Sequence, residues 1–371
     1  MTTLHTLYNE FGQSPWIDNI RRDWLDDGTL ADLVGSGVRG VTSNPSIFAR
    51  ALATSAAYDD AVTAHRDLDA EALFEVLAVS DVRDACDVLS VVHDAARAEF
   101  ASGRRRYGDG FVSLEVSPRL ARDTGATIAA ALRLNTAVNR PNVLIKIPAT
   151  LEGLPAITAV LGAGVNVNVT LIFSLARYSQ VLDAWLSGLE FAAASGHDLA
   201  GLASVASFFV SRVDSAVDPL LGETDPRRGT TANAQAARAY QLFRDRVAGE
   251  RASELLAAGA QVQRPLWAST SVKNPAYDEL LYVERLVADE TVNTMPDATL
   301  KATLAGGDFD RSPLLDPHET SAVAALLDDL PPEVSLDAVT DRLEVDGVAA
   351  FAASYDELLA TLRAKLDRAR P

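Results

Sequence analysis

The segment Asn142-Val143-Leu144-Ile145-Lys146-Ile147-Pro148-Ala149-Thr150 decides how this chain folds. Its run of Val, Leu and Ile is typical of a short buried strand, and the proline ends the run because it cannot donate to the ladder of a central strand. One lysine interrupts the apolar residues, although lysine is almost never buried unless it is paired or takes part in chemistry. Two interpretations follow: Lys146 is a functional amine, such as one that forms a Schiff base, or it lies at a strand end and reaches water.

Lysine is rare in this chain, which makes its place in an apolar segment informative. Only four of the 33 basic residues are lysines, and the others are arginines. Both side chains are cationic, but only lysine forms an imine with a carbonyl group. Burial disfavours a charged amine, so an apolar strand favours the neutral, nucleophilic form. These facts favour a functional Lys146 over a lysine that only reaches water.

The overall composition narrows the class of protein. The 371 residues are 48% hydrophobic and carry a net charge of −18, with a pI of about 4.7. Such a charge argues against a nucleic acid or an anionic membrane as partner. The N-terminus lacks the features of a signal peptide, no apolar run is long enough for a membrane span, and the single Cys86 permits no internal disulfide. We therefore expect a cytoplasmic protein.

Eight short apolar segments, separated by stretches of helical periodicity, indicate an α/β fold. This alternation predicts a (β/α)8 TIM barrel, with extra helices between the second and third segments. We expect one domain over 1–371, in which 305–371 form a C-terminal helical extension. The alternative is an open doubly wound sheet, but Gly35-Ser36-Gly37 precedes a strand instead of opening a helix. The predicted strands are residues 14–18, 38–43, 111–116, 142–148, 165–170, 204–209, 265–269 and 290–294.

Polar side chains gather near the C-terminal ends of these strands, where barrels form their active sites. They comprise one amine, two carboxylates and several amides and hydroxyls: Asp18, Asn44, Glu115, Lys146, Asn168, Thr170, Ser207 and Ser269 or Ser271. Taken singly, several of them have structural interpretations, such as a helix cap or a turn. The set lacks the Ser–His pair of a hydrolase, and the five histidines lack the spacing of metal ligands. An amine with two carboxylates suits carbonyl chemistry through an imine.

Four segments of the chain resemble the transaldolase family and occur in the family's order. They are Thr-Ser-Asn-Pro-Ser at 42–46, Leu-Ile-Lys-Ile-Pro-Ala-Thr at 144–150, Asn-Val-Thr-Leu-Ile-Phe-Ser at 168–174 and Ser-Phe-Phe-Val-Ser-Arg at 207–212. The resemblance extends over about residues 14–300. It implies a (β/α)8 barrel, a cytoplasmic transferase of carbohydrate metabolism in the pentose phosphate pathway, and neither cofactor nor metal.

The resemblance also implies a role for each residue of the expected site. Lys146 would form the Schiff base, Asp18 would take the proton of the C4 hydroxyl, and Glu115 would work with Thr170 through a water. The substrate would contact the remaining positions: Asn44, Asn168 and Ser207 for the dihydroxyacetone hydroxyls, Phe209 for the wall of the site, and Arg212, Ser271 and Lys273 for the phosphate. Lys273 stands where many members of the family have arginine.

The expected reaction follows from these roles. A transaldolase moves a dihydroxyacetone unit between sugar phosphates, converting sedoheptulose 7-phosphate and glyceraldehyde 3-phosphate to erythrose 4-phosphate and fructose 6-phosphate. Two alternatives are a Schiff-base fructose 6-phosphate aldolase, which is a lyase, and a catalytically silent barrel that only binds sugar phosphates. The sequence leaves the oligomeric state open, and a homodimer is one option.

Overall fold

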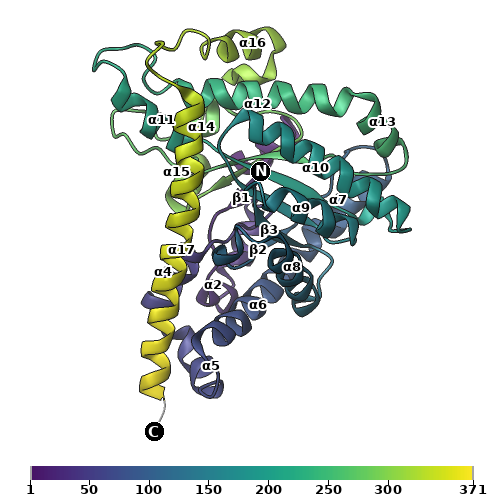
Figure 1. Ribbon diagram of the computed structural model, residues 1–371, viewed down its shortest axis with the longest axis vertical. Helices are drawn as coiled ribbons and strands as arrows, with labels where there is room; N and C mark the ends of the chain where they lie inside the picture. Colours follow the sequence, from purple (N-terminus) through teal and green to yellow (C-terminus); the bar gives the residue numbers. More distant parts are fainter. Residues whose placement is uncertain (1, 370–371) are drawn as a thin grey trace.

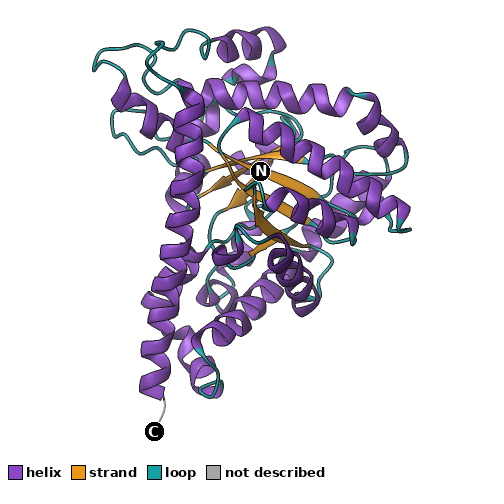
Figure 2. Cartoon of the chain, in the orientation of Figure 1, coloured by secondary structure: helices purple, strands orange, loops and turns teal. Residues whose placement is uncertain are grey.

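The computed structural model describes residues 2–369, and its centre is a sheet of seven parallel strands in the order β1-β7-β6-β5-β4-β3-β2. The strands lie in the middle of the molecule with helices around them (Figures 1 and 2). Each predicted strand except 38–43 corresponds to one of these strands within two residues at either end. The strands are β1 Gln13–Ile17, β2 Val112–Glu115, β3 Val143–Pro148, β4 Val167–Ile172, β5 Ser204–Phe209, β6 Arg264–Ala268 and β7 Thr291–Met295.

Segment 38–43 closes the barrel, but it is not the six-residue strand that the sequence predicts. Only Val41 forms β-bridges, one to Ile17 of β1 and one to Val112 of β2, both parallel. The Thr42 N–H donates to the Ile17 carbonyl over 2.9 Å, so the segment joins the two edge strands of the sheet. The pairing is short because the chain turns at Asn44 into the next helix. The ring is closed, which makes the fold a (β/α)8 barrel and excludes the open sheet.

The side chains of β3 alternate between two apolar layers. Val143, Ile145 and Ile147 belong to the large core shared with the helices, whereas Leu144 belongs to a separate cluster of side chains from several strands. Alternate residues of a strand share a face, so Lys146 projects in the same direction as Leu144, into the barrel. The polar interruption of the strand therefore places an amine inside the barrel.

Helices surround the sheet, and several of them lie in the long connection before β2, as expected. They are α1 Thr3–Asn9, α2 Arg22–Asp26, α3 Thr29–Gly35, α4 Pro45–Thr54, α5 Asp59–Ala64, α6 Ala70–Val88, α7 Ser90–Ala101, α8 Thr124–Val138, α9 Gly153–Gly162, α10 Leu175–Ala194, α11 Ser211–Val217, α12 Thr231–Ala248, α13 Glu250–Ala257, α14 Leu281–Glu284, α15 Asp297–Ala305, α16 Pro317–Ala325 and α17 Leu336–Ala369.

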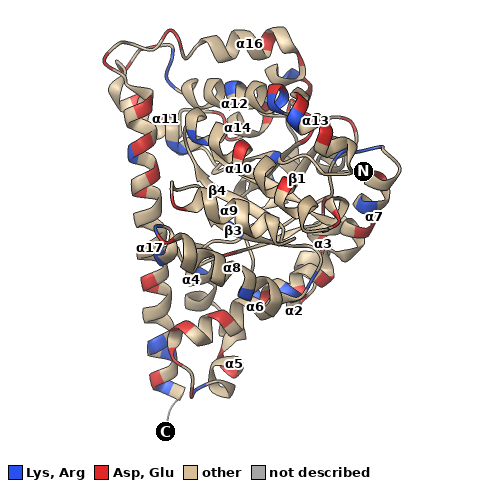
Figure 3. Ribbon diagram, turned by 45° about the vertical axis from the view of Figure 1, so that its right-hand side comes forward, with Lys and Arg blue, Asp and Glu red and all other residues tan. Residues whose placement is uncertain are grey.

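The C-terminal region ends in α17, a helix of 34 residues that runs along one side of the molecule (Figure 1). Charged residues, red or blue on the ribbon in Figure 3, occur along much of its length. Phe351, Tyr355, Leu358 and Leu362 form its buried stripe, and α17 packs chiefly against α4 and α6. This helix therefore covers the part of the barrel where α4 begins.

Candidate active site

A cavity of about 470 Å³ opens at the C-terminal ends of the strands. Its wall contains nine of the residues expected to form the site, together with residues from α4 and α17. Glu115 and Asn168 lie outside this wall, and the structure brings both against residues within it. The expected residues that line the cavity are Asp18, Asn44, Lys146, Thr170, Ser207, Phe209, Arg212, Ser271 and Lys273.

Three neighbouring strands place Glu115, Lys146 and Asn168 side by side. Lys146 is in register with Glu115 on β2 and with Asn168 on β4. The Lys146 Nζ lies 3.4 Å from Glu115 Oε2, and both side chains are almost fully buried. Burial raises the pKa of Glu115 to about 7, although the nearby Lys146 acts to lower it. A carboxyl with this pKa exchanges its proton readily at neutral pH.

Lys146 is oriented by the segment that closes the barrel. Its Nζ donates a hydrogen bond of 3.0 Å to the carbonyl of Ser43. The Ser43 hydroxyl in turn donates to the carbonyl of Ser113 on β2, over 2.7 Å. The amine is therefore held between two strands of the barrel by the backbone as well as by Glu115.

Asp18 supplies the second carboxylate of the site, directly after β1. It accepts a 2.7 Å hydrogen bond from the Thr42 hydroxyl. Burial raises the pKa of Asp18, and the charge of Lys146 opposes this change. Since both carboxyl groups interact electrostatically with Lys146, the site holds an amine between two groups that can move protons.

The amides and hydroxyls of the expected site fall into two groups. Asn168 is held by other side chains: its Nδ2 donates to the Ser113 hydroxyl over 2.9 Å, and its Oδ1 accepts from Ser207 over 2.7 Å. Asn44 caps α4, where its Oδ1 accepts from the Ile47 N–H, and it also lines the cavity. The Thr170 hydroxyl and both Glu115 oxygens are buried without a hydrogen-bond partner among residues 2–369. Such groups are rare in folded proteins and favour a functional role.

Cationic side chains stand on the wall of the cavity. Burial lowers the pKa of Arg212, whose guanidinium lies 5.3 Å from the ring centre of Phe209. Within the described part of the chain, this guanidinium has neither a hydrogen bond nor an ion pair. Lys273 donates to the Ser271 hydroxyl over 2.5 Å, and burial, with the charge of Arg212, lowers its pKa. Arg212 is partly buried and Lys273 is exposed, and two neighbouring cations at the mouth of a cavity are suited to binding an anion.

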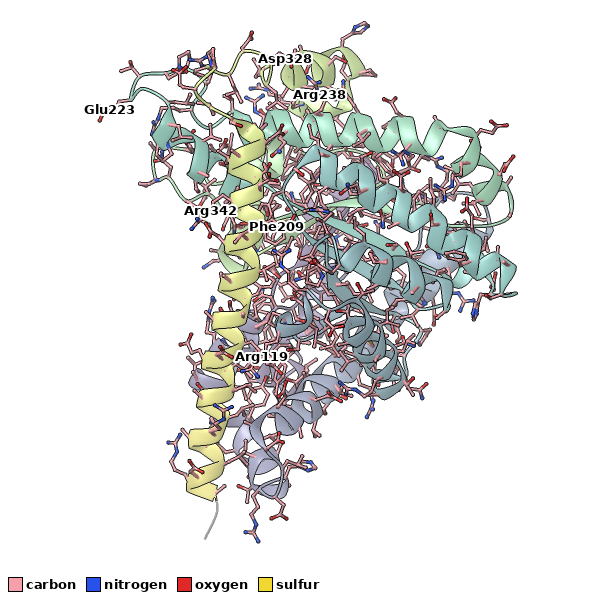
Figure 4. The ribbon with its side chains drawn as sticks, viewed as in Figure 1. Arg119, Phe209, Glu223, Arg238, Asp328 and Arg342 are labelled. Atoms are coloured by element: carbon pink, nitrogen blue, oxygen red, sulfur yellow. The ribbon has the colours of Figure 1, made fainter. Side chains whose placement is uncertain are left out.

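Arg50 and Phe351 are among the cavity residues that reasoning from the sequence missed. Arg50 lies on α4, and its charge acts on Asp18. The ring centre of Phe351, on α17, is 5.6 Å from the Lys146 Nζ. Phe351 shares the barrel cluster with Phe209, which Figure 4 labels beside the upper part of α17. Phe351 belongs to an apolar helical stripe, and that pattern alone indicates only a core residue.

The described residues form neither a cluster of metal ligands nor a membrane-spanning helix. In residues 2–369, no group of three or more His, Cys, Asp or Glu side chains is placed to hold a metal ion. The same part of the chain has no helix that is both long and apolar enough to cross a membrane.

Fold and site together define a barrel enzyme with a buried lysine between two carboxyl groups. Residues 15–362 match the family model described as Transaldolase/Fructose-6-phosphate aldolase. The chain is 49% identical to Transaldolase 1 of Streptomyces coelicolor, over 96% of this chain and 93% of that protein. It is 46% identical to Transaldolase of Saccharopolyspora erythraea over the full length of both, and 46% identical to Transaldolase of Thiobacillus denitrificans over 95% of this chain and 98% of that protein. The chain therefore belongs to the transaldolase/fructose-6-phosphate aldolase family.

Proposed function

We propose that this protein is a transaldolase that transfers a dihydroxyacetone unit between sugar phosphates through a Schiff base on Lys146. The observation that carries the proposal is the buried Lys146 amine, 3.4 Å from Glu115, at the mouth of the barrel. The donor would be sedoheptulose 7-phosphate or fructose 6-phosphate, and the acceptor erythrose 4-phosphate or glyceraldehyde 3-phosphate. The relatives' names support this activity.

The first half of the reaction forms the imine. The neutral Lys146 amine adds to the C2 carbonyl of the ketose phosphate and gives a carbinolamine. The C2–O bond then breaks: the hydroxyl takes a proton and leaves as water, while the nitrogen lone pair forms the C=N bond. Glu115, whose pKa is raised to about 7, is suited to give that proton through a water held with Thr170.

The second half breaks and remakes a carbon–carbon bond. Asp18 takes the proton of the C4 hydroxyl, the C3–C4 bond breaks, and its electron pair moves into the imine to leave an enamine. The aldose phosphate departs and an acceptor aldose phosphate enters. The enamine carbon attacks the acceptor aldehyde while Asp18 returns its proton to the aldehyde oxygen, and hydrolysis of the new imine by one water releases the product ketose and the Lys146 amine.

Substrate binding follows from the remaining residues of the site. Asn44, Asn168 and Ser207 would hold the dihydroxyacetone hydroxyls: Asn168 is in register with Lys146 and bonded to Ser207, while Asn44 and Ser207 line the same cavity as Lys146. The phosphate would bind to Arg212, Ser271 and Lys273. The net charge of −18 repels anions in general, so this local pair of cations must attract the substrate.

Phe209 favours transfer over the lyase reaction of an aldolase. Free dihydroxyacetone is released only after the enamine is protonated and the imine is hydrolysed. Phe209 lines the cavity beside Phe173, with ring centres 5.0 Å apart, and it offers no hydroxyl to a water. The enamine therefore persists until the acceptor arrives.

The same proposal includes the wider setting of the protein. The chain would form a single domain over 1–371, with 305–371 as an extension of the barrel, and it would act in the cytoplasm as part of the pentose phosphate pathway. Its small-molecule partners would be sugar phosphates.

A coupled assay with fructose 6-phosphate and erythrose 4-phosphate tests the proposal. We expect the wild-type protein to form sedoheptulose 7-phosphate, and borohydride to reduce a dihydroxyacetone adduct onto Lys146 alone. Lys146→Met should lose at least about 1,000-fold in kcat, since the nucleophile is absent. Lys301→Met, at an exposed position on α15, is the matched control and should keep full activity. A mark on Lys273, Lys301 or Lys365, or an active Lys146→Met, would contradict the proposal.

A further inference from the structure

A second cavity, of about 300 Å³, lies behind the site. Its wall is mostly apolar and comes from α4, α6, α8, α17 and the chain that follows β2. Glu115 also lines it, although its partner Lys146 lines the first cavity. Apolar residues of the wall include Phe48, Phe74, Ala78, Leu114, Ala130 and Leu134.

The two cavities meet at the ion pair of the site. Glu115 Oε2 and Lys146 Nζ are 3.4 Å apart, so the pair lies on the boundary between the cavities. Helix α17 contributes to both walls: Phe351 lines the first cavity and Tyr355, one turn later, lines the second. The Ser46 hydroxyl donates to Ser354 over 2.8 Å and fixes α17 against α4 at this point. A substrate bound to Lys146 would therefore have the second cavity behind Glu115.

Polar groups in the second cavity form a path from Glu115 to the surface. Both Glu115 oxygens and the Ser117 hydroxyl are buried and lack hydrogen-bond partners that satisfy ordinary geometry among residues 2–369. The Tyr355 hydroxyl lies near Ser117 and donates to Glu71 Oε1 over 3.1 Å. The Glu71 side chain is 56% exposed. The wall of the second cavity thus contains polar atoms at its buried end, at Glu115 and Ser117, and at its exposed end, at Tyr355 and Glu71.

We propose that this second cavity is the route by which water and protons reach and leave the Glu115–Lys146 pair, separate from the mouth that admits sugar phosphates. The proposal rests on the Schiff-base function proposed above. Imine formation releases one water from C2, and imine hydrolysis consumes one. While a sugar phosphate occupies the first cavity beneath Phe351, that water has to travel on the Glu115 side. A volume of 300 Å³ holds about ten waters at liquid density, and the polar atoms of the path supply their partners.

The rate of oxygen exchange at C2 of the sugar measures how fast water passes along this route. Each cycle of imine formation and hydrolysis replaces the C2 oxygen of fructose 6-phosphate with oxygen from the solvent. The rate of ¹⁸O incorporation from labelled water, without an acceptor, therefore reports the passage of water to Lys146. The spontaneous exchange of the sugar is measured with Lys146→Met protein and subtracted. The KM for fructose 6-phosphate, measured in the transfer assay, shows whether the sugar site is intact.

The first variant fills the cavity. Ala130 of α8 lines it, and Ala130→Leu places three additional carbon atoms there. Ala129→Leu adds the same atoms on the exposed side of the same helix and is the control. We expect Ala130→Leu to lower ¹⁸O exchange about fivefold to tenfold, with KM changed less than about twofold, whereas Ala129→Leu changes neither.

The second variant keeps the volume and removes one polar atom. Tyr355→Phe retains the ring that packs 5.7 Å from Phe74 but lacks the hydroxyl next to Glu71. Tyr240→Phe, which removes a hydroxyl bonded to the Asp289 carbonyl far along the chain, is the control. We expect Tyr355→Phe to lower ¹⁸O exchange about threefold and Tyr240→Phe to leave it unchanged.

These outcomes separate the route from the function on which it rests. A wild-type protein without exchange above the Lys146→Met background would overturn the Schiff-base function itself. Exchange in the wild type, with equal exchange in folded Ala130→Leu or in Tyr355→Phe, would overturn the route alone. Circular dichroism shows whether Ala130→Leu folds, and if it does not, Tyr355→Phe decides.

Discussion

The two ends of the barrel bury charged groups in opposite ways. At the N-terminal end, Asp109 accepts hydrogen bonds from Ser14, Trp16 and Arg39, and Arg264 pairs with it while only 1% exposed. At the C-terminal end, Glu115 has one charged partner, Lys146 at 3.4 Å, and neither of its oxygens forms a hydrogen bond of ordinary geometry within residues 2–369. The buried carboxylate at the N-terminal end has its partners within the protein, whereas the buried carboxyl at the C-terminal end can still accept a partner such as a substrate.

The pKa shifts of the two buried carboxyl groups express this difference. Burial acts to raise the pKa of Asp109, but the charges of Arg264 and Arg39 outweigh it, and the pKa is lowered. Burial also acts on Glu115, where a single lysine opposes it, and the pKa is raised to about 7. Full pairing keeps a carboxylate ionised and structural, whereas partial pairing leaves a proton that can move. The number of partners therefore distinguishes a buried charge that stabilises from one that reacts.

The largest expected effect comes from breaking the Asp109–Arg264 ion pair at the N-terminal end of the barrel. Asp109→Asn leaves the buried Arg264 without its full counter-charge, and breaking such a pair costs about 3–5 kcal/mol. Denaturation in urea should show this loss in the free energy of unfolding. Asp346→Asn, in a pair with Arg342 whose two side chains are 49% and 76% exposed, is the control and should cost far less. Equal free energies of unfolding for the two variants would mean that the buried ion pairs of Asp109 do not stabilise the barrel.

Substitution of Arg212, at the C-terminal end of the barrel, should affect substrate binding and not stability, the opposite of substituting Asp109. Arg212→Gln removes a partly buried guanidinium that has no ion pair in the described chain, so the free energy of unfolding should not fall. The KM for glyceraldehyde 3-phosphate should rise about 30-fold, which corresponds to about 2 kcal/mol of lost phosphate binding. Unphosphorylated glyceraldehyde serves as the control acceptor. Equal losses with both acceptors would reject the phosphate assignment.

Phe209→Tyr tests whether Phe209, in the cavity at the C-terminal end of the barrel, favours transfer over the release of free dihydroxyacetone. The new hydroxyl would orient a water or pass a proton to the enamine, so acceptor-free release of dihydroxyacetone should rise about tenfold while transfer falls. The ratio of the two rates, measured in wild type and variant, is the readout. Phe208→Tyr on the same strand, whose ring packs against Tyr178 outside the cavity, is the control. A wild-type protein that releases dihydroxyacetone as fast as it transfers it would be an aldolase.

The smallest expected effect is a change in pH dependence. The raised pKa means that Glu115 is protonated below about pH 7 and ionised above it. Its ability to give a proton to the leaving hydroxyl is therefore lost as the pH rises through about 7. Single-turnover borohydride trapping should show an inflection near pH 7 that Glu115→Gln removes. An unchanged inflection in the variant would assign the titration to another group.

Much of the fold and most of the site were predictable from local patterns. The apolar runs predicted seven strands within two residues, since a buried strand has a short period and a characteristic composition. Lys146 stood out because a charged residue in such a run is costly. Nine predicted site residues line the cavity because barrel strands are parallel and present their C-terminal ends on one face.

The sequence by itself determined the strands, the buried amine and the residues that follow each strand. Only the tertiary structure decided that segment 38–43 pairs through Val41 alone, that α17 brings Phe351 to Lys146, and that Glu115 opens into a second cavity. These features depend on contacts between residues far apart in the chain, such as Lys146 and Phe351. Local periodicity reports which side of an element is apolar, but the element that covers that side is selected by packing in three dimensions.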